Sequence, residues 1–354
     1  MITGAPQPWQ TSAPPAKQTA SPSILGRAVR WLPAAVLSFL CLSSVACTLT
    51  LVLLPMTRAA SPFGYDFVPP FSTSPDPSPP PPSLGYLLLA LYVAVWALAT
   101  ASFAATVRTP PGHVPQWLYS RDQGDKHYFH NVLQAVERKF DDSIRFCRKC
   151  GAFKPDLAHH SKQLGLCILC YQHWDVWSNN AIGFYNHKPY ILSLFYATLA
   201  HAFSLALLLP GVSRVWQSAA AASGEPAEQL VALALWVGGE GSVLAYAVLS
   251  VYAAAILGGG ALCWFIFHAS LVARGLTAHA FFRQGGCARH KPPKRAIAGR
   301  PFDFGVRGNF HRACGKTPLL WFLPTNAGVE GNGIFFDLAV EPTPAATGDV
   351  WGRP

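Results

Sequence analysis

The 354-residue chain is 51% hydrophobic and only 12% charged, and it carries a formal net charge of +10. An ordinary soluble domain has about 25% charged residues, so this composition argues against a soluble enzyme and indicates a membrane protein. The basic charge alone would also suit a nucleic-acid-binding protein, but no RNA- or DNA-binding motif accompanies it. We therefore expect a lipid bilayer, and no nucleic acid, as the partner of the basic residues.

Four uncharged apolar segments are each long enough to cross the ~30 Å hydrocarbon core of a bilayer as a helix. They are residues 31–56, 84–107, 190–212 and 243–267. The first is too long for a secretory signal, whose apolar core spans ~7–15 residues, and it begins too far from the N-terminus. His201 in the third segment is expected to face neighbouring helices. The glycines Gly258, Gly259 and Gly260 in the fourth mark either a close helix approach or a flexible point.

Five polar or proline-rich segments surround these spans. We expect a disordered tail, a proline-rich loop, a small Cys/His-rich domain, a connector and a C-terminal tail over residues 1–30, 57–83, 108–189, 213–242 and 268–354. Of the 27 Lys and Arg residues, all but Arg58 and Arg214 lie in the first, third and last of these segments. By the positive-inside rule these three segments, with both termini, are cytosolic, and the loop and connector are not. The chain is thus expected to be a multi-pass protein of an endomembrane (endoplasmic reticulum or Golgi) or of the plasma membrane.

Two C-x2-C pairs, Cys147/Cys150 and Cys167/Cys170, are separated by 16 residues within the Cys/His-rich domain. Cytosolic thiols stay reduced, and this spacing is typical of a zinc site. A tetrahedral site can be built in two ways, either from all four cysteines or from Cys147, Cys150, His160 and Cys167. The spacing does not decide between the two ligand sets.

The segment from Cys147 to Tyr190 resembles the cysteine-rich domain of the DHHC protein S-acyltransferases, also called palmitoyltransferases. Their pattern is C-x2-C-x9-H-C-x2-C-x2-C-x4-D-H-H-C-x-W, followed by an Asn-Cys pair, Gly and Asn, and the register holds without a gap. The family's first zinc site falls on Cys147, Cys150, His160 and Cys167, and the later positions fall on Trp177, Asn180, Gly183 and Asn186. The resemblance extends to residues 302–315, FDFGVRGNFHRACG, where Asn309 falls on the family's Asn and Cys314 replaces an aromatic residue.

This resemblance implies an all-α polytopic membrane fold with four transmembrane helices and a small cytosolic zinc-binding domain between the second and third spans. It also implies one structural zinc ion, acyl-CoA such as palmitoyl-CoA as the donor, and substrate proteins at the cytosolic face. The family's second zinc site cannot form, because its four ligand positions hold Ser161, Leu164, Trp174 and Ala181. Trp174 and Trp177 then either pack the region that lacks this zinc or anchor at the bilayer surface.

The family's signature tetrapeptide reads Gln172-His173-Trp174-Asp175 here. In the family a thiolate at the last position accepts the acyl group, whereas Asp175 would form a higher-energy mixed anhydride. His173 can act as a base, but a carboxylate at neutral pH has no proton to give up. Gln172 lacks the charge that would stabilise an imidazolium. We therefore expect an impaired enzyme that holds acyl chains, substrate proteins or an active acyltransferase at the membrane.

Two alternatives stay open. The chain could be an active palmitoyltransferase with a displaced nucleophile, for which Cys170 is the candidate if His160 binds the zinc. It could instead be a membrane adaptor whose zinc domain uses Cys170 as its fourth ligand.

Overall fold

The structure is a computed structural model that describes residues 24–57, 81–119, 133, 135–137, 139, 143–222, 241–283 and 301–339. The chain divides into two compact units. One consists of Met1–Trp31, Phe103–Ile191 and Phe267–Pro354, and the other of Leu32–Ser102 and Leu192–Ile266. Much of the N-terminal tail, the proline-rich loop, the connector and the C-terminal tail predicted from the sequence lies outside the described residues, over 1–23, 58–80, 223–240, 284–300 and 340–354.

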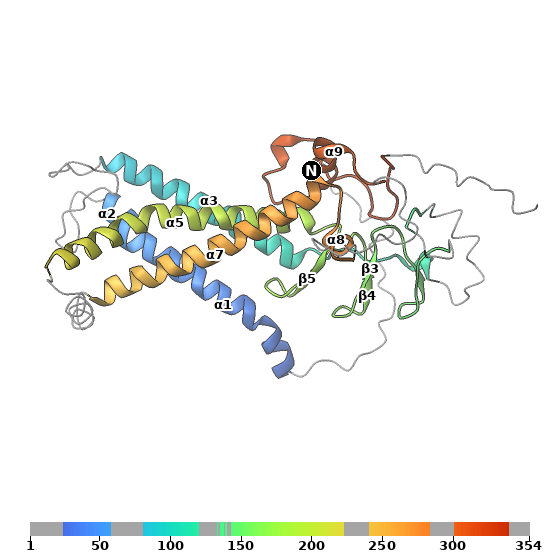
Figure 1. The fold of residues 1–354 in the computed structure, drawn as a ribbon, viewed down its shortest axis with the longest axis horizontal. Helices are drawn as coiled ribbons and strands as arrows, with labels where there is room; N and C mark the ends of the chain where they lie inside the picture. Colours follow the sequence, from blue (N-terminus) through green and yellow to red (C-terminus); the bar gives the residue numbers. More distant parts are fainter. Residues whose placement is uncertain are drawn as a thin grey trace, which may run out of the picture. The chain divides into compact units, whose positions relative to one another are not determined.

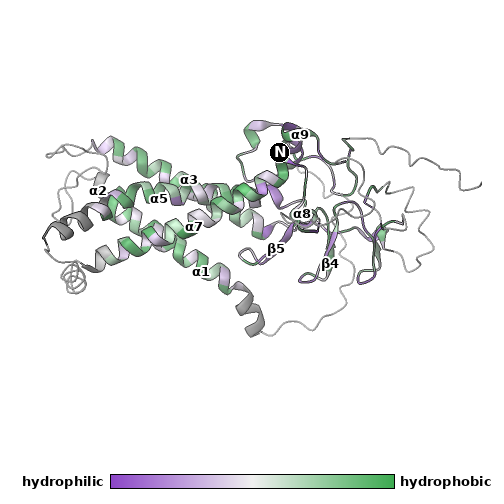
Figure 2. Cartoon of the chain, viewed as in Figure 1, coloured by the Kyte–Doolittle hydropathy of each residue, from purple (hydrophilic) through white to green (hydrophobic). Residues whose placement is uncertain are grey.

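Long apolar helices make up most of the described chain (Figure 1). α1 (Ile24–Thr48) continues through the π-helical turn η2 (Leu49–Leu53) into α2 (Leu54–Thr57), and it is followed by α3 (Pro82–Arg108), α5 (His187–Ala222) and α7 (Gly241–Ala273). The segments long and apolar enough to cross a membrane are Trp31–Leu53, Pro82–Arg108, His187–Pro210 and Ala245–Ala273. Figure 2 shows hydrophobic residues along these helices. The prediction of a mostly helical protein with four candidate spans is confirmed.

The N-terminal helix starts earlier than the sequence analysis expected. α1 begins at Ile24, inside the segment predicted to be a disordered tail. Between Pro22 and Pro33 the sequence contains no proline, so nothing there removes a helical hydrogen bond or blocks a helical turn.

Large apolar side chains remain exposed along the candidate spans. Phe39 and Ile256 are each 71% exposed, and Leu249 is 67% exposed. Contact with water would forfeit the free energy that burial of such side chains provides, whereas the hydrocarbon of a bilayer would cover them. The exposed surface of these helices is therefore the surface expected of membrane-spanning helices.

His201 lies inside the helical unit, facing neighbouring helices as the sequence predicts. It is 2% exposed, and its ring packs edge-on against Trp96 with 5.2 Å between the centroids. A Cβ atom on Gly258 would lie 2.8 Å from the His201 Cβ, while one on Gly259 or Gly260 would meet no atom within 4 Å. Gly258 is thus the glycine of this run that permits a close helix approach.

Three antiparallel hairpins fall between α3 and α5 in the sequence, so the all-α class needs correction to a mostly helical fold with small β elements. They pair β1 (Phe146–Cys147) with β2 (Ala152–Phe153), β3 (His159–Ser161) with β4 (Leu166–Ile168), and β5 (His173–Asp175) with β6 (Asn180–Ile182). Strands of two or three residues are too short to show an alternation of apolar and polar residues, which is why the sequence pattern did not predict them.

Side-chain amides connect the hairpin-containing unit to the helix ends within it. The Asn180 amide nitrogen lies within hydrogen-bond distance, 3.2 to 3.4 Å, of three carbonyl oxygens at the C-terminal end of α3, namely those of Thr106, Val107 and Thr109. The Asn309 amide, on α9 (Gly305–Cys314), donates to the carbonyl of Ala273 at the end of α7 at 3.0 Å. Helix C-termini leave their last carbonyls unsatisfied, and these two asparagines supply the missing donors. The unit also contains η3 (Gln116–Leu118), α8 (Ala278–Arg283) and η5 (Pro318–Leu320).

Candidate metal centre and signature strand

The first two hairpins bring four soft ligand atoms together. One atom each from Cys147, Cys150, His160 and Cys167 lies within 4.8 Å of every other. Cys147 is the last residue of β1 and Cys150 lies in the β1–β2 turn, while His160 and Cys167 are direct cross-strand partners in β3 and β4. The two C-x2-C pairs do not contribute equally, because Cys170 is not in this group.

The distances in this cluster suit a tetrahedral zinc site. The Nδ1 atom of His160 lies 3.1 Å from the Cys150 sulfur and 3.7 Å from the Cys147 sulfur. Zn–S and Zn–N bonds of about 2.3 and 2.0 Å at tetrahedral angles place sulfur and nitrogen about 3.5 Å apart. Three thiols and one imidazole are also the soft donors that zinc prefers in structural sites. The cluster therefore fits one zinc ion.

The electrostatics of the cluster favour the metal-binding form of cysteine. Hydrogen bonds, first from the Cys167 thiol and then from the His160 ring, lower the pKa of Cys150 to about 5 despite its partial burial. This shift favours the thiolate, which is the form of cysteine that binds zinc. Among the residues that the structure describes, all eight cysteines are free of disulfides.

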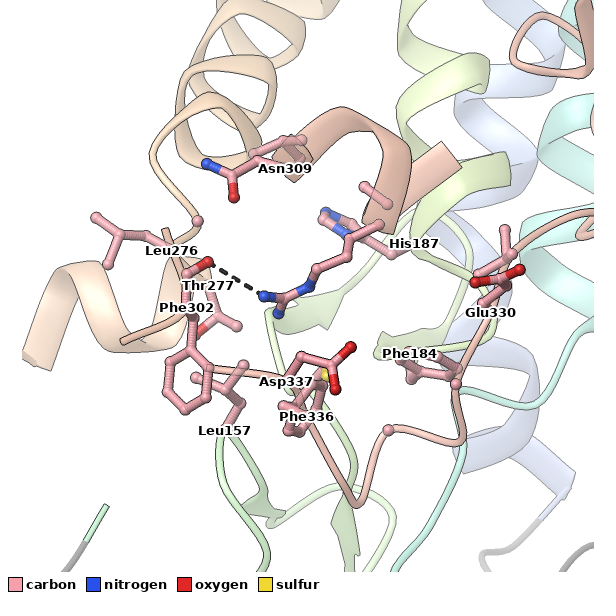
Figure 3. Close-up of a pocket in the computed structure, with 18 of the residues that line it drawn as sticks. Leu157, Phe184, His187, Leu276, Thr277, Phe302, Asn309, Glu330, Phe336 and Asp337 are labelled. Carbon is pink, nitrogen blue, oxygen red and sulfur yellow. Dashed lines mark hydrogen bonds between the residues drawn. The ribbon is translucent and has the colours of Figure 1, made fainter. Parts of the chain in front are cut away.

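Cys170 occupies a different place. Its backbone has a left-handed φ of 47°, which few residues other than glycine adopt. It lines a cavity of about 300 Å³ together with Gln172 and Arg312. Figure 3 shows this cavity, in which the Arg312 guanidinium donates to the carbonyl oxygen of Phe302. Burial raises the pKa of the Cys170 thiol to about 12, so this cysteine is a neutral thiol at physiological pH.

The signature residues 172–175 include the strand β5. Asp175 is 6% exposed, and its Oδ2 atom accepts a hydrogen bond from the backbone N–H of Ser178 at 2.8 Å. His173 is two residues earlier on the same strand, so both side chains lie on the same face. Burial lowers the pKa of His173, and the nearby Asp175 carboxylate offsets this in part.

Gln172 has structural partners on both ends of its amide. It is 4% exposed. Its Oε1 atom accepts a hydrogen bond from the backbone N–H of Ala278, at the start of α8, at 2.8 Å. Its Nε2 atom donates to the carbonyl of Cys170 at 3.3 Å. The amide therefore links strand β5 to the segment that follows α7.

The four positions without zinc ligands are held by pairing and packing. Trp174 is the cross-strand partner of Ala181 in the third hairpin, so a large side chain faces a small one. Ala181 is fully buried and Ser161 is 1% exposed. The Ser161 hydroxyl accepts a hydrogen bond from the backbone N–H of Leu164 at 3.4 Å. Strand pairing and hydrogen bonds are thus made at positions where the family has ligands of its second zinc ion.

Sequence reasoning missed the aromatic and imidazole rings around His173. Its ring centroid lies 5.1 Å from that of His268 and 5.3 Å from that of Tyr190. His187 lies 5.8 Å from His268 by the same measure. These residues come from α5 and α7 and are up to 95 residues away from His173 in sequence, so no local spacing could have identified them.

These features define the chain as a polytopic membrane protein with a Cys/His metal-binding domain of zinc-finger type. Residues 141–285 match the family model of the DHHC palmitoyltransferases. The chain thus contains a domain that matches this family, with Gln172-His173-Trp174-Asp175 in place of the signature tetrapeptide, as the resemblance predicted.

Curated relatives cover most of the chain at low identity. "Probable protein S-acyltransferase 12" of Arabidopsis thaliana is 26% identical over 242 residues, which cover 68% of this chain and 74% of that protein. "Probable protein S-acyltransferase 13" of the same plant is 28% identical over 244 residues, covering 68% and 72%. "Palmitoyltransferase ZDHHC15A" of Danio rerio is 27% identical over 276 residues, covering 72% and 75%.

Proposed function

We propose that this protein is a catalytically impaired palmitoyltransferase-family member that binds acyl donors, substrate proteins or an active acyltransferase at the membrane. The observation that carries the proposal is the residue at the nucleophile position. Asp175 has a carboxylate in place of a thiol, and that carboxylate is buried and engaged by the Ser178 N–H. The Asp175 carboxylate stabilises the turn through this hydrogen bond, and it would have to break the bond before it could attack an acyl donor.

The chemistry of a carboxylate supports this proposal. Exchange between two thioesters is nearly balanced in free energy, whereas transfer of an acyl group onto Asp175 would form an anhydride. A base activates a nucleophile by removing its proton, and an ionised carboxylate has none, so His173 has nothing to activate. Gln172 offers His173 no negative charge to stabilise an imidazolium, and its amide is already bonded to Ala278 and Cys170.

One structural zinc ion is part of the proposal. Its ligands would be Cys147, Cys150, His160 and Cys167, whose ligand atoms form one group. Zinc bound there would cross-link the first two hairpins. The third hairpin, which includes residues 173–175, would keep its shape through its own hydrogen bonds and the packing of Trp174.

The membrane arrangement is also proposed. The four candidate spans would place the Cys/His-rich domain 108–189, residues 1–30 and residues 268–354 in the cytosol, with 57–83 and 213–242 on the opposite side. The distribution of Lys and Arg in the sequence supports this orientation. An endomembrane (endoplasmic reticulum or Golgi) or the plasma membrane would house the protein, with palmitoyl-CoA and protein partners meeting it at the cytosolic face.

The two alternatives receive less support. A displaced nucleophile at Cys170 would need a thiolate, and partial burial raises the pKa of this thiol to about 12. An adaptor domain that uses Cys170 as its fourth zinc ligand would need its sulfur near the other three, and His160 holds that place in the cluster.

Acyl labelling of the purified full chain tests the proposal. We expect wild-type protein incubated with alkyne-palmitoyl-CoA to form no hydroxylamine-sensitive adduct. An Asp175→Cys variant should form one, because a thiol there would share a strand face with His173. A hydroxylamine-sensitive adduct that forms on the wild-type chain at turnover rates would contradict impairment, and its loss in Cys170→Ala would identify the displaced nucleophile.

The binding role has its own test. The wild-type protein in nanodiscs should bind palmitoyl-CoA without consuming it, or should co-purify with an acyltransferase that does label. Failure of both would remove the binding and scaffolding role while leaving the labelling result intact.

A further inference from the structure

A short segment after α9 presents large apolar side chains outward. Over residues 316–323, which we name the apolar loop, Leu319 is 86% exposed, Phe322 is 55% exposed and Leu323 is 43% exposed. The sequence of this loop, KTPLLWFL, contains no acidic residue. Such a concentration of exposed apolar surface usually marks a contact with a partner or a membrane.

The outward direction of these side chains is fixed by the fold of the loop. Backbone hydrogen bonds close the 3-10 turn η5, from Leu320 N–H to the Thr317 carbonyl and from Trp321 N–H to the Pro318 carbonyl. Trp321 points the other way. Its Nε1 atom donates to the Gly315 carbonyl at 2.7 Å, and its ring stacks on Phe310 with 6.1 Å between centroids. One aromatic side chain thus anchors the loop inward while its neighbours stay exposed.

The apolar loop is tied to the first turn of a candidate membrane span. Lys188 is the second residue of the span His187–Pro210 and is 2% exposed. Its Nζ atom donates a hydrogen bond to the Leu320 carbonyl at 2.8 Å. Just beyond the loop, the Asn326 amide donates to the carbonyl of Tyr185. These two bonds hold the loop beside residues 185–188, where α5 begins.

The start of a span lies at the boundary between hydrocarbon and headgroups. A loop bonded to that point is therefore at the depth where interfacial segments bury their apolar side chains, about 5–10 Å into the headgroup and acyl boundary. Lys316, at the start of the loop, is exposed and pairs with Glu330 at 2.8 Å, so the loop adds little net charge. Its attraction to a membrane would come from its apolar side chains.

We propose that the apolar loop is a membrane-surface contact, in which Leu319, Phe322 and Leu323 insert into the same leaflet boundary at which α5 enters the bilayer. Continuity with the end of this span favours lipid over a second copy of the chain or a partner protein. The contact would give the C-terminal segment an attachment to the bilayer in addition to the four spans.

Site-specific photocrosslinking tests this contact in the full chain. Photo-leucine at Leu319 closely matches the native side chain, so it should leave the fold intact. The protein would be reconstituted in nanodiscs of phosphatidylcholine and phosphatidylserine and irradiated. The matched control carries the same probe at Lys139, an exposed position of the Cys/His-rich domain. We expect phospholipid adducts on residue 319, detected as a mass shift, at a yield several-fold above that at residue 139.

Other outcomes would overturn the proposal. Equal lipid yields at the two positions would mean that the loop is not at the membrane. A cross-linked dimer at residue 319 would identify a second copy as the occupant. As a second measurement, Leu323→Glu should lower the lipid yield from the probe at 319 while the yield at 139 stays unchanged, and an unaltered yield at 319 would count against insertion.

Discussion

Two neighbouring regions of the Cys/His-rich domain are held in different ways. In the first, four ligand atoms from β1, β3, β4 and the β1–β2 turn lie within 4.8 Å of one another and suit a zinc ion. In the second, the family's ligand positions hold Ser161 in β3, Leu164 in the β3–β4 turn, and Trp174 and Ala181 in β5 and β6. Hydrogen bonds and strand pairing make the contacts there. The first region thus has the ligands for a metal ion, and the second has only hydrogen bonds and strand pairing.

The largest expected effect comes from removing a ligand of the first region. Cys147→Ser should abolish zinc binding and unfold the first two hairpins, since structural zinc in small domains supplies ~10–16 kcal/mol of apparent folding free energy. Zinc content by mass spectrometry and hydrogen exchange of residues 146–168 would measure this. Cys170→Ser is the matched control and should retain the zinc. Loss of zinc in the control, with retention in His160→Ala, would instead favour the ligand set of four cysteines.

The next effect concerns the tryptophan of the second region. Trp174→Ala should destabilise the third hairpin by about 2 kcal/mol, roughly half the cost of truncating a fully buried tryptophan, because Trp174 is half-buried. Hydrogen exchange of residues 172–182 would measure the loss, and zinc content should not change. The exposed Trp177, at the adjoining turn, is the control. If Trp174→Ala released the zinc, the two regions would not be independent.

A smaller effect is expected at the nucleophile position. Asp175→Ala should cost about 1 kcal/mol, the usual loss when a side-chain acceptor of a backbone N–H is removed, because the Ser178 N–H loses its partner. Asp175→Asn keeps an acceptor oxygen and should cost less. Thermal unfolding of the two variants, compared side by side, checks this order. Equal stability of both variants and wild type would show that the carboxylate has no structural role.

The smallest effect is a pH dependence of the second region. Burial lowers the pKa of His173, so the folded state holds this ring neutral at pH values where the unfolded chain already binds a proton. Stability should therefore be complete well above the ordinary histidine pKa of about 6.5 and should decline as the pH falls below it. His173→Gln should weaken this decline in the exchange of residues 172–182. An identical pH profile in the variant would contradict the assignment.

Local patterns made the four candidate spans and the Cys/His cluster predictable. Long uncharged runs identify spans because a helix must cover the bilayer thickness, and the C-x2-C pairs identify a metal site because nearby cysteines can share an ion. The spacing of the cysteines does not decide whether His160 or Cys170 is the fourth member of the cluster. That choice depends on the cross-strand pairing of His160 with Cys167 and on the left-handed backbone that turns Cys170 toward a cavity.

Other parts of the site had no sequence signal. The short strands carry too few residues for a hydrophobic period, so the hairpins were missed. The neighbours of His173, such as His268, come from distant helices and meet only in the folded chain. In the sequence, the residues of the apolar loop do not differ from other apolar residues. Only the hydrogen bond between Lys188 and Leu320 places the loop beside the start of α5.

The hydrogen bonds of the Asn180 amide determine how the third hairpin is attached to the end of α3. An amide nitrogen carries two hydrogens, yet three carbonyls at the end of α3 lie within its reach, those of Thr106, Val107 and Thr109. One acceptor is thus in surplus, so the loss of any one of the three leaves a partner for each hydrogen. The attachment of the signature strand's hairpin to the end of α3 therefore does not depend on a single hydrogen bond.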